Sequence, residues 1–134
     1  MESLFALKNK STIDLAIFEH MKGIAIHLLS NATHGQYTQA IVLRSVSGKE
    51  YGAVIKNALS EEKADEACLI QRIKDAKDTE ICCALCMWYD HSIDIPSFAC
   101  RKLLFALNPR NSETSLFVMS TDGISKIKLS QTMK

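Results

Sequence analysis

The sequence has little of what usually points to a function. Its five glycines are scattered singly, so neither a G-x-G-x-x-G nor a Walker A phosphate-binding loop is present. No run of about 20 predominantly apolar residues occurs, as a membrane span would need. The N-terminus also lacks the basic start, apolar block and cleavage site of a secretory signal. We therefore expect a cytoplasmic protein without a membrane partner.

The net charge and the composition also do not indicate a particular function. With a net charge of +1, the chain has no general reason to bind nucleic acid, which usually requires a clearly basic face. Its 134 residues, of which 47% are apolar and 23% charged, are those of an ordinary globular protein. No repeat, linker or low-complexity segment divides it. We expect one domain covering residues 1–134.

The stretch 81–89 carries no charge and is central to the predicted fold. Continuous apolarity is typical of a central strand that is covered on both faces. A helix follows, opened by Pro96 and closed by Asn108 and Pro109. The whole chain predicts an α+β domain with a mostly antiparallel sheet and the element order αββαβαββ. The other expected elements are a helix from Ser11 or Thr12 to about 29, a helix at 60–76 capped by Ser60, and strands at 37–45, 50–56, 115–120 and 124–129.

Five cysteines offer the most visible candidate chemistry: Cys68, Cys82, Cys83, Cys86 and Cys100. Their number is odd and all have apolar neighbours, which favours reduced thiols in a core. Cys83 and Cys86 form a C-x-x-C, but residues three apart on a strand point to opposite faces. Cys82 and Cys86 share a face but lie about 13 Å apart, at roughly 3.3 Å per residue. We therefore expect neither a metal site nor another cofactor.

The histidines do not change this expectation. His20, His27 and His34 recur every seven residues. On a helix, His20 and His27 lie about 10.5 Å apart along the axis, at roughly 1.5 Å per residue, which is too far for one metal ion. No H-E-x-x-H spacing occurs.

The loop 90–95 follows the central strand and contains acid, base and hydroxyl side chains: Asp90, His91, Ser92 and Asp94. Ligands often bind at strand ends in α/β sheets, so a small enzyme with its site in this loop is one interpretation. The structural interpretation is that Asp94 or Ser97 caps the next helix. No G-x-S-x-G elbow accompanies Ser92, and we predict no catalytic residues.

The charges are unevenly distributed along the chain. Residues 61–78 hold six acids against four bases, whereas residues 101–134 hold six bases against two acids. An acidic helix and a basic end are compatible with charge-matched docking of a protein partner. An RNA-associated or regulatory module that uses the basic C-terminal hairpin is an alternative.

Residues 94–133 contain a helix opened by I-P-S, closed by L-N-P-x-N and followed by a short hairpin. This pattern resembles the C-terminal part of small bacterial immunity proteins, above all those paired with contact-dependent growth-inhibition toxins. The resemblance implies a non-enzymatic cytosolic protein that binds and neutralises a cognate toxin domain, often a nuclease. Against the basic groove of a nuclease, the expected contacts are acidic: first Glu61, Glu62, Asp65 and Glu66, then the loop residues Asp90, His91 and Asp94. The sequence predicts no oligomeric state.

Overall fold

The computed structural model describes residues 2–33, 35–121 and 123–133, with side chains from Leu15 onward. Its elements follow the predicted order, with one short strand and two 3-10 helices added. They are α1 (Glu2–Ser30), β1 (Gln39–Ser45), β2 (Glu50–Ile55), α2 (Ala64–Asp75), β3 (Ile81–Trp88), β4 (Ile93–Asp94), α3 (Phe98–Leu107), η1 (Pro109–Glu113), β5 (Ser115–Ser120), β6 (Gly123–Lys128) and η2 (Leu129–Thr132). His34, considered above as a possible metal ligand, lies outside the described residues.

Six strands form one mixed sheet in which β3 is central. Strand β1 pairs antiparallel with both β2 and β3, and β5 pairs antiparallel with β6. The other edge of β3 is shared by two strands. Its first half pairs in parallel with β5, through Cys83 and Ala84, and its second half pairs antiparallel with β4, through Cys86 and Met87. The predicted α+β domain with a mostly antiparallel sheet is confirmed.

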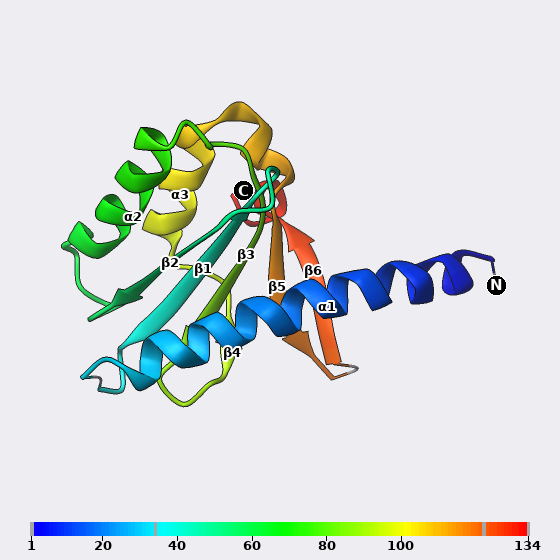
Figure 1. Cartoon of the computed structure of the whole chain (residues 1–134), viewed down its shortest axis with the longest axis horizontal. Coiled ribbons are helices and arrows are strands. Elements are labelled where there is room, and N and C mark those ends of the chain that lie inside the picture. Colours follow the sequence, from blue (N-terminus) through cyan, green and yellow to red (C-terminus); the bar gives the residue numbers. More distant parts are fainter. Residues whose placement is uncertain (1, 34, 122, 134) are drawn as a thin grey trace.

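The helices cover both faces of this sheet. Figure 1 shows α1 lying across one face, whereas α2 and α3 lie side by side on the other. On the first face, Met21 and Leu29 of α1 pack in one core cluster with Leu85 of β3. On the second face, Leu69 of α2 and Leu104 of α3 belong to another cluster. Strand β3 is therefore buried on both sides, as its charge-free sequence predicts.

Helix α1 is longer than its sequence pattern predicts, since it begins at Glu2 rather than at Ser11 or Thr12. No proline or glycine interrupts residues 2–22, so nothing in that stretch stops the helix. No described helix is long and apolar enough to cross a membrane.

Helix α2 begins three residues later than predicted, because its N-cap position is Lys63 instead of Ser60 and its first residue is Ala64. The Ser60 hydroxyl accepts a hydrogen bond from the Glu62 amide (3.1 Å), so Ser60 stabilises a turn that precedes the helix. Lys63 occupies the N-cap position, and no side chain caps the helix there. The predicted loop after β3 also contains a short strand, because Ile93–Asp94 pairs with β3 as β4.

The apolar neighbours of the cysteines predicted that all five lie in the core, but only three of them do. Cys83, Cys86 and Cys100 are buried, whereas Cys82 is half-buried and Cys68 is exposed on α2. Cys68 is exposed because it lies on the outer side of a helix whose inward stripe is formed by Leu69, Ile70 and Ile73.

Candidate functional site

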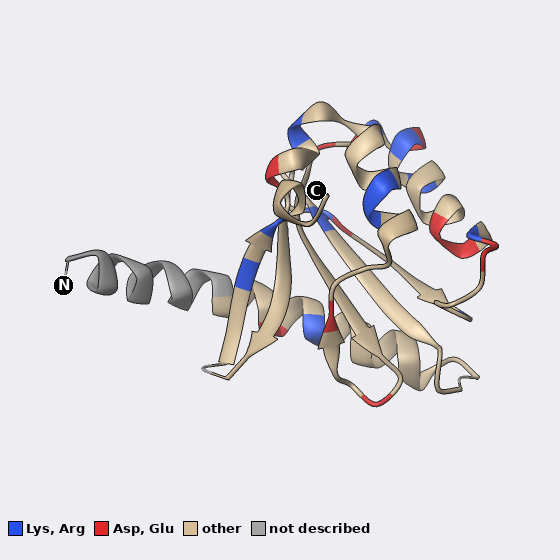
Figure 2. Ribbon diagram, turned by 180° about the vertical axis from the view of Figure 1, so that it is seen from behind, with Lys and Arg blue, Asp and Glu red and all other residues tan. Residues whose placement is uncertain are grey.

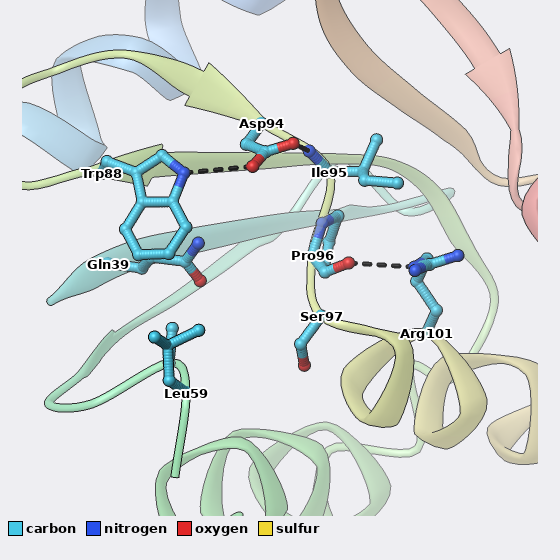
Figure 3. Close-up of a pocket in the computed structure, with 9 residues that line it drawn as sticks. Gln39, Leu59, Trp88, Asp94, Ile95, Pro96, Ser97 and Arg101 are labelled. Carbon is cyan, nitrogen blue, oxygen red and sulfur yellow. Dashed lines mark hydrogen bonds between the residues drawn. The ribbon is translucent and has the colours of Figure 1, made fainter. Parts of the chain in front are cut away.

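A pocket of about 230 Å³ opens at the C-terminal end of β3, beside the first turn of α3 (Figure 3). Its wall includes the β2–α2 loop, the first residue of β1 and the start of α3. Leu59 and Ile95 supply apolar surface. The polar side chains come from Gln39, Asp94, Ser97 and Arg101, and Trp88 adds the indole ring. An apolar wall with a few polar groups is typical of a small-molecule site.

Trp88 and Asp94 form a fixed pair at one side of the pocket. The indole Nε1 donates a hydrogen bond to Asp94 Oδ2 (3.1 Å), and Asp94 Oδ1 accepts one from the Ile95 amide (2.8 Å). Pairing of β4 with β3 brings Asp94 opposite Cys86 in the sheet, which places its carboxylate within reach of Trp88. Asp94 is thus oriented by the sheet rather than by the helix that it was expected to cap.

Gln39 lies directly opposite Trp88 in the β1–β3 register, so both side chains are on the same face of the sheet. Figure 3 shows its amide beside the indole ring. Gln39 is only 5% exposed, and its side-chain amide makes no hydrogen bond to any residue that the structure describes. Because no buried side-chain N or O atom among the described residues lacks a partner, this amide is open to the pocket that it lines. An amide that faces a pocket with its donor and its acceptor free is well suited to bind the polar edge of a ligand.

The start of α3 forms the opposite side of the pocket. Ser97 is the N-cap, and its Oγ accepts a hydrogen bond from the Cys100 amide (3.2 Å), which confirms the predicted cap at this residue. Arg101 donates from Nε to the Pro96 carbonyl and from Nη1 to the Thr132 carbonyl, both at 2.9 Å. The guanidinium is therefore held in place before any ligand arrives.

Next to the pocket, α2 and α3 meet at a buried acid. Glu66, in the first turn of α2, is only 3% exposed. The Lys63 ammonium lies 3.6 Å from Glu66 Oε2 and donates a hydrogen bond to the Ala58 carbonyl at 2.9 Å. Burial, with a smaller effect of Glu66, raises the pKa of the Cys100 thiol on α3 to about 12, although Lys63 and Arg101 act to lower it. Glu66, Lys63 and Cys100 thus belong to one electrostatic cluster.

The acidic residues that were expected to contact a partner do not form one continuous surface. Glu61 and Glu62 are exposed in the turn before α2, and Asp65 is half-buried, with its carboxylate accepting a hydrogen bond from the Lys56 amide (3.0 Å). The ribbon in Figure 2 shows this acidic segment at the start of α2. Glu66, by contrast, is buried and does not belong to an outer acidic face, because it lies three and four residues before Leu69 and Ile70 on the inward stripe of α2.

The loop after β3 divides between two sides of the molecule. Asp94 lines the pocket described above, whereas His91 and Ser92 line a second pocket, of about 430 Å³, together with residues of α1 and the β5–β6 hairpin. Asp90 Oδ1 accepts hydrogen bonds from the Ser92 hydroxyl (2.6 Å) and amide (3.0 Å), which hold the pKa of Asp90 below its ordinary value. Asp90 and His91 therefore do not join Asp94 in a single site.

The structure is similar to solved cytidine deaminases. The matches include the enzyme from Bacillus anthracis (TM-score 0.66, 14% identity, covering 87% of this chain and 86% of that one) and the enzyme from Mycobacterium leprae (0.64, 16%, 87% and 96%). The cytidine deaminase from Burkholderia pseudomallei matches as well (0.62, 12%, 84% and 93%). The chain has the cytidine deaminase fold. No protein-family model matches the sequence, and no curated protein sequence matches it either.

This likeness overturns the immunity-protein interpretation. The pattern of residues 94–133 is part of a fold that solved enzymes share over most of this chain. Its resemblance to immunity proteins was therefore limited to the residues that begin and end a helix and a turn. The predicted toxin partner and the conclusion that the protein is non-enzymatic were therefore wrong. The alternative interpretation, a small enzyme with its site in the loop at residues 90–94, agrees better with this fold.

Several residues of the pocket were missed by the sequence analysis. Gln39 is a polar residue at the start of a strand, and Trp88 lies within an apolar run, so neither has a local pattern that marks a site. Their relation depends on pairing between strands that are nearly fifty residues apart. Only Pro96-Ser97 at the start of a helix, with Cys100 one turn later, offered a signal, and it was interpreted as a cap alone.

Proposed function

We propose that the pocket between β3 and α3 binds a pyrimidine base or nucleoside. The observation that carries the proposal is the Gln39–Trp88 pair, which presents a free amide beside an aromatic ring inside a deaminase-type fold. A side-chain amide can bind the donor–acceptor edge of a base with two hydrogen bonds, and an indole ring can stack on its face.

The size and charge of the pocket support a small ligand. At about 230 Å³ it is below the ~300–1,000 Å³ of sites for drug-sized ligands. Asp94 and Arg101 supply one acceptor and one cationic donor at its wall. Arg101 has two of its nitrogens bound to carbonyls, while its Nη2 makes no hydrogen bond to a described residue. These groups suit the hydroxyl and carbonyl groups of a nucleoside.

A zinc-dependent reaction does not fit the residues of this chain. Zinc deaminases carry the signature H-x-E…P-C-x-x-C, in which His or Cys and two further Cys bind Zn²⁺ and Glu transfers protons. Here α2 begins with Ala64-Asp65-Glu66, and α3 is preceded and opened by Pro96-Ser97-Phe98-Ala99-Cys100. The glutamate, the proline and one cysteine remain, but Ala64 and Ser97 stand where two metal ligands would be.

The remaining donors do not replace those ligands. A catalytic zinc site needs three protein ligands, and Cys100 alone is left of the signature. Within the part of the chain that the structure describes, no group of three or more His, Cys, Asp or Glu side chains could hold a metal ion. The proposal is therefore one of ligand binding, and no step of it involves zinc.

Trp88 allows a direct test because it is the single tryptophan of the chain and lines the pocket. We expect cytidine, uridine or cytosine to change its fluorescence in a saturable way. Gln39→Ala should abolish the change or weaken binding strongly, since it removes the free amide. The matched control is Gln71→Ala, because Gln71 is exposed on α2 and bonds only to Asp75 (2.9 Å). The proposal is wrong if no pyrimidine changes the fluorescence, or if Gln39→Ala binds as well as the wild type.

A further inference from the structure

The junction of α2 and α3 has a buried acid, Glu66, but lacks two of the three side chains with which the zinc-deaminase signature binds its metal ion. Ala64 has no donor atom, and the Ser97 hydroxyl accepts the Cys100 amide as a helix cap. A buried carboxylate such as Glu66 nevertheless needs a nearby positive charge or hydrogen-bond donors, because its desolvation is costly.

That positive charge comes from the chain itself. We infer that the Lys63 ammonium takes the place of a metal ion at this junction, as a built-in cation that neutralises Glu66. Lys63 immediately precedes Ala64 and has its Nζ 3.6 Å from Glu66 Oε2. A hydrogen bond to the Ala58 carbonyl (2.9 Å) fixes the ammonium there. The inference does not depend on which ligand the neighbouring pocket binds.

The geometry around Glu66 leaves no room for a second positive charge. Because its Nζ lies 3.6 Å from Glu66 Oε2 and is bound to the Ala58 carbonyl, the Lys63 ammonium would repel another cation placed beside this carboxylate.

Cobalt binding tests whether Lys63 and the two replaced ligands share one site. Co²⁺ bound by three thiolates gives intense visible absorption bands. We expect none in the wild type under reducing conditions. The variant Ala64→Cys/Ser97→Cys should bind Co²⁺, and adding Lys63→Met to it should tighten binding roughly tenfold or more, because a neighbouring like charge is removed.

Each outcome of the cobalt experiment decides something. Tetrahedral bands in the wild type that Cys100→Ser removes would show a metal site and overturn the inference. Absence of binding by the triple variant would show that Ala64 and Ser97 are not at ligand positions. Equal Co²⁺ affinity with and without Lys63 would show that the ammonium does not occupy the cation position.

A double-mutant cycle gives a second test that needs no new metal site. Lys63→Met should lower the urea midpoint of unfolding, and the same substitution in a Glu66→Gln background should lower it less, because no buried charge is then left unpaired. The control pair is Lys128 and Glu113, which are 2.9 Å apart but exposed, so the corresponding cycle should show little coupling. Additive effects of Lys63→Met and Glu66→Gln would contradict the inference.

Discussion

Helices α2 and α3 lie side by side on one face of the sheet, but different interactions hold their ends. The start of α3 has a serine cap, and its last turn is bound by the buried Asn111, whose Nδ2 donates to the Leu104 carbonyl (3.0 Å). These bonds involve neutral groups. The start of α2 has no side-chain cap and relies on the ion pair of Lys63 with Glu66.

The connection that follows α2 also depends on a charge. The Asp78 carboxylate accepts hydrogen bonds from the hydroxyls of Ser45 (2.7 Å), Ser47 (2.9 Å) and Tyr51 (2.9 Å), which tie the α2–β3 connection to the β1–β2 hairpin. Two helices of one layer are therefore held in different ways: neutral hydrogen bonds fix both ends of α3, whereas charged groups hold the start of α2 and the connection that follows it.

The largest effect is expected from removing the amide that anchors the end of α3. Asn111 is fully buried, accepts a hydrogen bond from the Ile81 amide (2.8 Å) and donates to the Thr79 and Leu104 carbonyls (both 3.0 Å). Asn111→Ala should cost about 3 kcal/mol of unfolding free energy, because buried partners lose their bonds. Urea unfolding measures this. The control is Asn31→Ala, because Asn31 follows the end of α1, is exposed and bonds only to His27 through its amide, so its loss should change stability by less than ~0.5 kcal/mol. A similar cost for both variants would mean that Asn111 does not anchor α3.

Loss of the serine at the start of α3 should reduce stability more than loss of the serine that precedes α2. Ser97→Ala should cost about 1 kcal/mol, because it removes the cap of α3. Ser60→Ala should change stability by less than ~0.5 kcal/mol, since Ser60 lies in a turn before α2 and is not its cap. Thermal or urea unfolding of both variants gives the comparison, and a larger loss for Ser60→Ala would reverse it.

Acidification should weaken the hydrogen bonds of Asp78, in the connection after α2, but not those of the neutral Asn111 amide at the end of α3. The Ser45 hydroxyl is the main cause that lowers the folded-state pKa of Asp78 below its ordinary value of 3.8, with Tyr51 and Ser47 assisting. Its stabilisation is therefore present above pH 3.8 and is lost as the pH falls through the lower folded-state value. The stability difference between the wild type and Asp78→Asn should shrink on acidification, whereas that for Asn111→Ala should not. A difference for Asp78→Asn that stays constant with pH would contradict this.

The smallest perturbation is a chemical label on the two helices. Cys68 is exposed on α2, whereas Cys100 is buried on α3 with a pKa raised to about 12. A thiol reagent at neutral pH should modify Cys68 readily and Cys100 only after unfolding, because the thiolate is the reactive form. Mass analysis of labelled peptides identifies the modified residues, with Cys68→Ser as the control. Rapid labelling of Cys100 in the folded protein would show that the α2–α3 junction is open.

Hydrophobic patterning was enough to predict the order of the elements. The uncharged stretch that became β3 and the alternating hairpin strands carry their own periodicity, and Pro96 and Asn108 mark the limits of α3. The sequence pattern placed the start of α2 too early, because Ser60 followed by two acids is typical of an N-cap. The actual N-cap residue, Lys63, is not a residue type that caps helices. The two-residue β4 exists only through pairing with β3, which no local pattern indicates.

The candidate site was harder to predict for a related reason. Gln39 and Trp88 become neighbours only through strand register, which no local sequence pattern indicates. Of the loop at residues 90–94, only Asp94 lines the pocket. Glu66 was noticed for its charge, although its burial gives it a different role.

The central claim is that a lysine ammonium, and no metal ion, neutralises the buried acid between α2 and α3. Native mass spectrometry of the purified protein after incubation with Zn²⁺ tests it most directly. We predict the mass of the chain alone, with no stoichiometric zinc adduct, for the wild type and for Cys100→Ser alike. One zinc ion retained by the wild type and lost in Cys100→Ser would contradict the account.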